Sequence, residues 1–140
     1  MSKFVAILED DAERLAQMRI CLGQLLPQYE CVCFDDSSKM IGWLKEHLPE
    51  VVLISLDHDL PMEPDHGNGR DVADWLSTYS PVCPAIVHTS NEFFAPAMMQ
   101  VLADCGWHVE RVYPHSDHHW VAVGWSQQIR EFMQTGWIFG

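Results

Sequence analysis

The chain has 140 residues, enough for one domain that buries a sizeable core. Its 20 acidic residues against 8 lysines and arginines give a net charge of −12, which argues against duplex DNA or RNA as a partner. No stretch resembles a signal peptide or approaches membrane-spanning length, so we expect no membrane association. The five cysteines form no CxxC pair, which is typical of reduced thiols in a cytoplasmic protein.

Apolar runs and amphipathic stretches alternate along the first half of the chain. The runs FVAIL (4–8), ECVCF (30–34) and VVLISL (51–56) predict strands, and the third is apolar enough to be buried on both faces. Helical spacing of apolar residues predicts one helix from Asp11 to Pro27. A second begins within Asp35–Ser38 and ends near Pro49.

The same alternation continues through the second half. It predicts a helix over 69–79, a strand over 84–90, a helix that ends at Gly106, a strand over 107–113 and a helix over 120–134. Five βα units at this spacing predict a single α/β domain over 1–140, with helices covering both faces of a doubly wound parallel sheet. The apolar tail 137–139 is expected to pack on the last helix, with a homodimer contact as the alternative.

Polar residues follow four of the predicted strands. Glu9 and Asp10 end the first strand, and Asp57 ends the third. The fourth strand ends in His88, Thr89 and Ser90, and His115 follows the fifth. Because ligands of such sheets bind at the carboxyl ends of the strands, these side chains are predicted to converge on one rim.

With these residues in place, the sequence resembles the receiver domain of two-component response regulators over nearly its whole length. Glu9-Asp10 matches the acidic pair of that family, Asp57 in LISLDHDLP matches the phosphoacceptor, and Thr89 in PAIVHTS matches the switch hydroxyl. The resemblance implies a five-stranded sheet in the order 2-1-3-4-5 and a Mg²⁺ ion held by Glu9, Asp10 and Asp57. It also implies a phosphodonor or histidine kinase as partner.

Two features depart from the receiver pattern. The Lys-Pro expected after the fifth strand is Tyr113-Pro114, and the last lysine of the chain is Lys45. Histidines are enriched, in LDHDL (56–60), in HTSN (88–91) and in HSDHH (115–119). This pattern is similar to a divergent receiver branch proposed to process cyclic phosphates.

The carboxylates are the natural place for a cation. Glu9, Asp10 and Asp57 held together would raise one another's pKa values unless a cation neutralised them, and Mg²⁺ prefers oxygen ligands. Asp57 could then attack a phosphoryl donor as a nucleophile. The alternative is that the acidic residues after the first strand only cap a helix, and we prefer that interpretation for Asp11.

His58, His88 and His115 come from three separate segments and could act as general acids and bases. If they bind metal, Mn²⁺ or Zn²⁺ would suit their mixed nitrogen and oxygen ligands. A structural role is the alternative for each. Asp59 could orient an attacking water, or it could simply face solvent.

The residues after the fourth strand could bind a phosphate. Thr89, Ser90 and Asn91 could donate hydrogen bonds to its oxygens at a helix N-terminus. Ser90 or Asn91 could equally be the N-cap of the following helix.

Three functions remain open at this point. The first is a stand-alone receiver-like signalling domain with a metal and phosphate pocket centred on Asp57. The second is a metal-dependent phosphoesterase that acts on a phosphate-bearing small molecule, either a cyclic phosphate or a nucleotide. The third is a degenerate receiver that only binds proteins.

Overall fold

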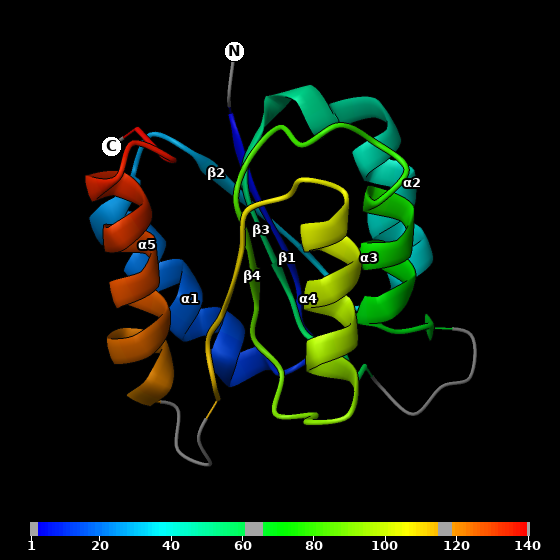
Figure 1. Cartoon of the computed structure of the whole chain (residues 1–140). Coiled ribbons are helices and arrows are strands. Elements are labelled where there is room, and N and C mark those ends of the chain that lie inside the picture. The colour runs from blue at the N-terminus through cyan, green and yellow to red at the C-terminus, as the bar shows by residue number, and fades with distance from the viewer. Residues whose placement is uncertain (1–2, 61–65, 115–118, 140) are drawn as a thin grey trace.

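The computed structural model describes residues 3–60, 66–114 and 119–139. Its sheet has five parallel strands, which are β1 (Phe4–Leu8), β2 (Glu30–Phe34), β3 (Val51–Leu56), β4 (Ala85–Val87) and β5 (Val109–Arg111). They lie in the order β2-β1-β3-β4-β5. This order confirms the one that the receiver resemblance implied (Figure 1).

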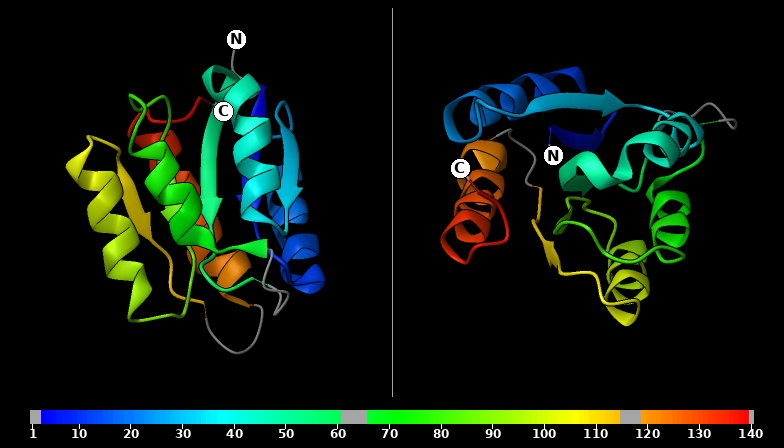
Figure 2. Two further views of the ribbon diagram at one scale, coloured as in Figure 1. Left: turned by 90° about the vertical axis from the view of Figure 1, so that its right-hand side faces the viewer. Right: turned by 90° about the horizontal axis from the view of Figure 1, so that it is seen from above.

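Helices cover both faces of the sheet (Figures 1 and 2). One face carries α1 (Ala12–Leu25) and α5 (Ser126–Gln134), and the other carries α2 (Ser37–His47), α3 (Gly69–Leu76) and α4 (Phe94–Asp104). A short 3-10 turn (Leu48–Glu50) precedes β3. Among the described helices none is long and apolar enough to cross a membrane.

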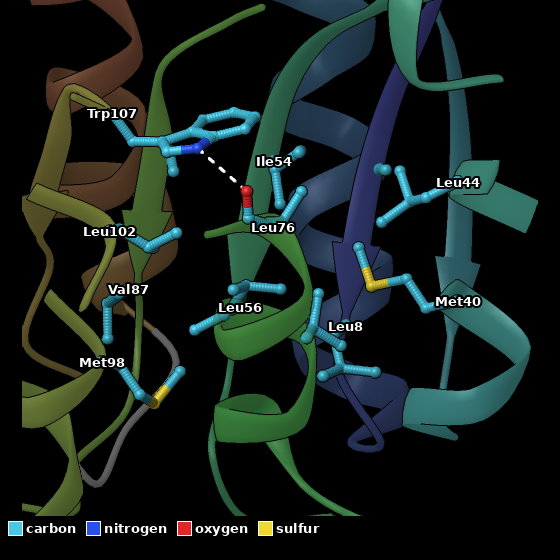
Figure 3. Packing of buried hydrophobic residues seen from close by; sticks show 14 of the residues in the cluster. Leu8, Met40, Leu44, Ile54, Leu56, Leu76, Val87, Met98, Leu102 and Trp107 are labelled. Atoms are coloured by element: carbon cyan, nitrogen blue, oxygen red, sulfur yellow. Dashed lines mark hydrogen bonds between the residues drawn. The ribbon is translucent and has the colours of Figure 1, made fainter. Parts of the chain in front are cut away.

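The sheet separates two apolar clusters, since successive side chains of a strand point to opposite faces. In β1, Ala6 and Leu8 join the cluster beneath α2, α3 and α4, while Val5 and Ile7 join the cluster beneath α1 and α5. Figure 3 shows the first cluster, where the indole N–H of Trp107 donates to the carbonyl of Leu76 at 3.2 Å.

The second cluster collects the half-buried thiols and the tail. Cys31 and Cys33 pack against it from β2, with their sulfur atoms 3.5 Å apart. Ile138 is buried in it and its N–H donates to Phe132, so the C-terminal tail folds back on α5 as expected. Trp137 stacks on His108 beside it.

Side-chain caps fix where the helices begin. The Asp11 carboxylate accepts from the N–H groups of Glu13 and Arg14, so Asp11 is the N-cap of α1, as predicted. Asp36 caps α2 in the same way. Asn68 and Asp71 form a capping box at the start of α3.

Several elements are shorter than the sequence predicts. β4 covers three of the residues 84–90, and β5 covers three of the residues 107–113. The Trp107 N–H bonds to the carbonyl of Leu102, so this residue closes the end of α4 instead of starting a strand. α3 ends at Leu76 because Ser77 and Thr78 turn their hydroxyls back onto backbone carbonyls.

The last helix differs in kind. The predicted helix over 120–134 contains a π-helical turn at Val121–Trp125 before the regular helix α5. Such wide turns are rare and occur mostly near functional sites.

One glycine holds the end of β3 against α3. The Gly69 N–H donates to the carbonyl of His58 at 3.0 Å, and a Cβ on Gly69 would collide with the backbone carbonyl of Asp57. The side chain of Met98 lies on the same side, at 2.8 Å from that Cβ position. The absence of a side chain at Gly69 therefore lets α3 begin directly against Asp57.

We predict that Gly69→Ala destabilises the fold by about 1–3 kcal/mol, because the fixed Asp57 backbone cannot yield to the added methyl group. Gly42 in α2 is the matched control, since nothing lies within 4 Å of its Cβ position. Gly42→Ala should be neutral or stabilise by up to about 1 kcal/mol through helix propensity. Urea unfolding measures both free energies, and equal behaviour of the two variants would contradict the close approach.

Candidate functional site

Glu9, directly after β1, is a carboxylate with no exposed surface. Its Oε2 accepts the backbone N–H groups of Asp10 and Asp11, both at 3.0 Å. Its Oε1 lies 3.1 Å from Nε2 of His88 and 3.6 Å from Nη1 of Arg14. A buried carboxylate is costly unless donors surround it, and here both oxygens have partners.

His88 links this carboxylate to Ser55 in β3 and, through Ser55, to Trp125 at the end of the π-helical turn. Its Nδ1 lies 2.6 Å from Oγ of Ser55 in β3, and that oxygen also accepts the indole N–H of Trp125 at 3.0 Å. Because ionised Glu9 can only accept, Nε2 of His88 must carry a proton. The chain Trp125–Ser55–His88–Glu9 therefore fixes the orientation of the imidazole.

The surroundings shift the carboxyl pKa values in opposite directions. Burial by itself would raise the pKa of Glu9, but the hydrogen bond and charge of His88, the N–H of Asp11 and the charge of Arg14 together outweigh burial and lower the pKa to about 2. Desolvation, followed by the hydrogen bond and charge of Glu9, raises the pKa of Asp10 to about 6. Desolvation also raises the pKa of Asp57, against the lowering effect of His88.

An acidic cavity of about 620 Å³ opens at the same rim. Asp10, Asp57 and Asp59 line it together with Arg14 and Ser90. The guanidinium of Arg14 reaches from α1, with Nη1 3.8 Å from Oδ2 of Asp57. We refer to this space as the acidic cavity.

His58 and Asp59 form a second carboxylate–imidazole pair at its mouth. His58 Nδ1 lies 2.9 Å from Oδ1 of Asp59, which also accepts from Nδ2 of Asn91 at 3.3 Å. The His58 ring is buried and stacks on Phe94, with centroids 4.1 Å apart. Within the described part of the chain, Nε2 of His58 has no hydrogen-bond partner. Asp59 itself is 64% exposed, so its carboxylate can meet a ligand.

Of the three residues after β4 that were predicted at the rim, Ser90 lies there, whereas His88 and Thr89 are buried. The Thr89 hydroxyl accepts the N–H of Asn91 at 3.2 Å, and it helps to lower the pKa of the Asp57 carboxyl. Ser90 is exposed and lines the acidic cavity. The side-chain oxygen of Asn91 accepts the N–H groups of Phe93 and Phe94, so Asn91 caps the start of α4.

Two further expectations concern the end of the chain. Tyr113 stands at the position of the expected lysine, and it is 48% exposed with its ring 5.0 Å from the guanidinium of Arg111. His115 lies outside the described residues.

Sequence reasoning missed Arg14, Ser55 and Trp125. Alternation along the strands could have found Ser55, because it shares the face of Leu53 and lies on the α1 and α5 side of β3. Arg14 and Trp125 lie on helical segments, and the local sequence does not predict how such a segment is rotated about its axis against the sheet.

Two arrangements of ligand atoms could hold a cation. Glu9, Asp57 and His88 place one potential ligand atom each within 4.8 Å of one another, but Glu9 and His88 already bond to each other. Asp10 and Asp57 both face the acidic cavity and are the more accessible pair. Both carboxyl pKa values are raised, and the positive charge of a bound cation would lower them again.

Comparison with known proteins points to one family. The family model of the cyclic-phosphate processing receiver domain matches residues 5–104. No curated protein matches the chain in sequence.

Solved structures with the same fold include response regulators. The phosphorylated cyanobacterial phytochrome response regulator RcpA is 17% identical, with 97% of this chain and 96% of that chain covered and a TM-score of 0.72. The Mn²⁺-bound form of response regulator Rcp1 is 16% identical, with coverages of 99% and 96% and a TM-score of 0.68. The receiver domain of a LuxO repressor from Vibrio parahaemolyticus is 15% identical, with coverages of 100% and 99% and a TM-score of 0.65.

The raised pKa of Asp10 predicts a pH dependence of stability. Its ordinary value is 3.8 and its folded value about 6, so the folded state binds more protons in this interval and loses stability as pH rises through it. The lowered pKa of Glu9 makes stability rise with pH, but only below about pH 4.5. In a chelator, the melting temperature should therefore fall between pH 4.5 and 6.5, and Asp10→Asn should flatten the slope. A variant with the wild-type slope would contradict this account of Asp10.

The buried chain predicts the effect of removing Ser55. Ser55→Ala leaves the Trp125 N–H and Nδ1 of His88 without a partner, at about 1–3 kcal/mol for each group. Adding Trp125→Phe removes one of the two orphaned groups, so the double variant should lose less than the sum of the single losses. Chemical denaturation of the four proteins measures the coupling, and strict additivity would count against the chain.

Proposed function

The chain belongs to the family of cyclic-phosphate processing receiver domains, and from this we propose that it is a metal-dependent phosphoesterase that opens cyclic phosphate esters in the acidic cavity. Its fold is that of a response-regulator receiver, and fold alone does not choose between hydrolysis and phosphoacceptance. The choice rests on the side chains at the rim.

The observation that carries the proposal is the third carboxylate. A phosphoacceptor needs Asp57 and a cation, whereas Asp59 is a further carboxylate in the same cavity, held by His58 and Asn91. A carboxylate with an imidazole partner is suited to remove a proton from an attacking water. Tyr113, at the position of the receiver lysine, offers no cation to a stored aspartyl phosphate.

The donor atoms that face the cavity fit a hard cation. Asp10 and Asp57 would hold Mg²⁺ or Mn²⁺, which when bound would neutralise the phosphate and polarise its P–O bonds. Rcp1, of the same fold, is known in a Mn²⁺-bound form. If Glu9 also bound the cation, it would have to give up one of its hydrogen-bond donors. Zn²⁺ bound through Nε2 of His88 would break the hydrogen bond between His88 and Glu9.

The remaining residues then have distinct tasks. Arg14 and Ser90 bind and orient the phosphate, and Asp59 takes the proton of the water whose oxygen attacks phosphorus. The ester P–O bond breaks, the ring opens, and the leaving oxygen is protonated from solvent. His58 positions Asp59. His88 is wholly buried, with both ring nitrogens bonded, so we propose that it positions Glu9 and the loop that carries Asp10.

A specific observation also favours a second function, an aspartyl phosphate on Asp57. The buried Thr89 hydroxyl lies close enough to Asp57 to lower the pKa of its carboxyl, and a hydroxyl in that place could bind a phosphoryl group on Asp57. Arg14 supplies the positive charge beside Asp57 that the missing lysine would give. A phosphodonor or histidine kinase would then be the partner.

Hydrolysis is tested on a panel of cyclic phosphates with Mg²⁺ and Mn²⁺. We expect metal-dependent ring opening, with kcat reduced about 100-fold or more in Asp57→Asn and in Asp59→Asn, the loss typical of a missing catalytic group. Asp104→Asn is the control, because this exposed carboxylate on α4 bonds only to Gln100 in the described structure. Absence of turnover with either metal, or turnover indifferent to Asp59, would refute the proposal.

Phosphoacceptance is tested by intact mass after incubation with phosphoramidate and Mg²⁺. A stable adduct on the wild type that is lost in Asp57→Asn would establish the second function. If Asp59 promotes hydrolysis, Asp59→Asn should lengthen the lifetime of any adduct. If neither the wild type nor Asp59→Asn gains mass, phosphoacceptance from this donor is excluded.

A further inference from the structure

The C-x-C motif of β2 brings two thiols together outside the acidic cavity. Cys31 and Cys33 are two positions apart in the strand, so their side chains point to the same face of the sheet. Their sulfur atoms lie 3.5 Å apart, close enough for one thiol to donate a hydrogen bond to the other. Both residues are half-buried, whereas Cys21 and Cys83 are buried. The pair is therefore a close dithiol that small reagents can reach from solvent.

The position of β2 adds to this accessibility. In the sheet as described, β2 is an edge strand with β1 as its neighbour (Figure 2). Cys33 also lines a cavity of about 280 Å³, together with Asp10, Leu15 and Asp35. A reagent can therefore approach Cys33 through this cavity, and the backbone of the edge strand can shift more easily than that of a central strand.

One of the two thiols ionises near neutral pH. The hydrogen bond from Cys31, joined by the charge of Arg19, lowers the pKa of Cys33 to about 7 against the raising effect of desolvation. The same hydrogen bond, followed by desolvation, raises the pKa of Cys31. The guanidinium of Arg19 reaches the pair from α1, with Nη1 3.5 Å from the carbonyl oxygen of Cys31. Cys33 is therefore the thiolate, which is the nucleophilic form, and Cys31 is the donor beside it.

The surroundings favour oxidation of this pair over the binding of a soft cation. Arg19 places a positive charge near both sulfur atoms, which stabilises a thiolate but repels a metal ion. Two thiols also fill only half of the tetrahedral shell of a structural Zn²⁺. Anionic reagents such as glutathione disulfide are repelled by the net charge of −12 and by Asp10 and Asp35 in the cavity. An uncharged hydroperoxide meets neither obstacle.

We propose that Cys31 and Cys33 form a site of reversible oxidation, at which an uncharged hydroperoxide converts the two thiols into a disulfide. The Cys33 thiolate attacks the outer oxygen of the peroxide, the O–O bond breaks, and Cys33 becomes a sulfenic acid. The leaving alkoxide or hydroxide takes a proton from solvent. The Cys31 sulfur then attacks the Cys33 sulfur, the S–O bond breaks, and the hydroxyl group leaves as water with the Cys31 proton.

A thiol reductant should open this disulfide readily. Residues two positions apart in a strand have Cα atoms about 6.6 Å apart, near the upper limit of about 6.8 Å for a disulfide. The bond therefore strains the strand, and strained disulfides are among the most easily reduced.

The first test follows the thiols of the wild-type protein during brief treatment with hydrogen peroxide. Free thiols are then blocked with N-ethylmaleimide in denaturant, and the chain is cut after glutamate, which at Glu30 separates Cys21 from the pair. We expect the peptide that begins at Cys31 to be unlabelled and lighter by two hydrogens, and dithiothreitol to reverse this change. The pair should be oxidised at least about threefold faster than the exposed thiol of Cys105, since more of Cys33 is thiolate.

Three variants test the order of the two attacks. Cys31→Ser keeps a hydroxyl donor beside Cys33 but removes the second sulfur, so a sulfenic acid should accumulate on Cys33 and react with dimedone. Cys31→Ala removes the donor as well and should form the sulfenic acid several-fold more slowly. Cys105→Ser is the matched control and should form the disulfide like the wild type.

If Cys31 and Cys33 still react with maleimide after peroxide has oxidised Cys105, the proposal is overturned. Zinc or copper that co-purifies with the wild type and is absent from the double variant Cys31→Ser/Cys33→Ser would also overturn it, because the pair would then be a metal site. Equal rates of sulfenic acid formation in Cys31→Ser and Cys31→Ala would contradict the activation of Cys33 by its neighbour. The proposed phosphoesterase function does not enter these tests, since none of them uses a phosphate ester.

Discussion

The buried Glu9 carboxylate is the constraint on which the site depends. A charge with no exposed surface survives in a fold only when donors replace the water it has lost. Here the donors are two backbone N–H groups of the following loop and the imidazole of His88. Satisfying this one carboxylate therefore sets the course of the loop after β1 and the position of a side chain from β4.

The consequences reach the acidic cavity and the start of the last helix. The loop that Glu9 holds places Asp10 at the rim beside Asp57, and the negative charge of Glu9 helps to raise the pKa of Asp10 to about 6, after desolvation. On the other side, His88 is held by Ser55 and stacks on Trp120, which lines a cavity of about 690 Å³ between the end of β5 and the last helix. A polar chain inside the sheet thus connects an open acidic surface with an aromatic one.

Local patterns predicted the architecture well, because in a doubly wound fold the strands are short apolar runs and the helices between them begin at capping residues. The strand order followed from the receiver resemblance, and Asp10, Asp57 and Ser90, which were expected at one rim, line one cavity. Asp59, for which solvent exposure was an equal alternative, lines that cavity too. Three-dimensional packing decided the rest. His88 was expected at the rim with the others, yet it is wholly buried, because it shares the face of Ile86 and points toward α1 and α5. Arg14, the cation beside Asp57, comes from a helix whose rotation no local pattern reveals.

A crystal structure with Mn²⁺, located by its anomalous signal, tests most directly whether Asp10 and Asp57 bind the metal while Glu9 and His88 stay bonded to each other. We predict a manganese peak bonded to Asp10 and Asp57, with Nε2 of His88 still within hydrogen-bond distance of Glu9. A peak coordinated by Glu9 and His88, with the bond between them broken, would contradict the account. Such a result would mean that Glu9 serves the metal and not the loop that carries Asp10.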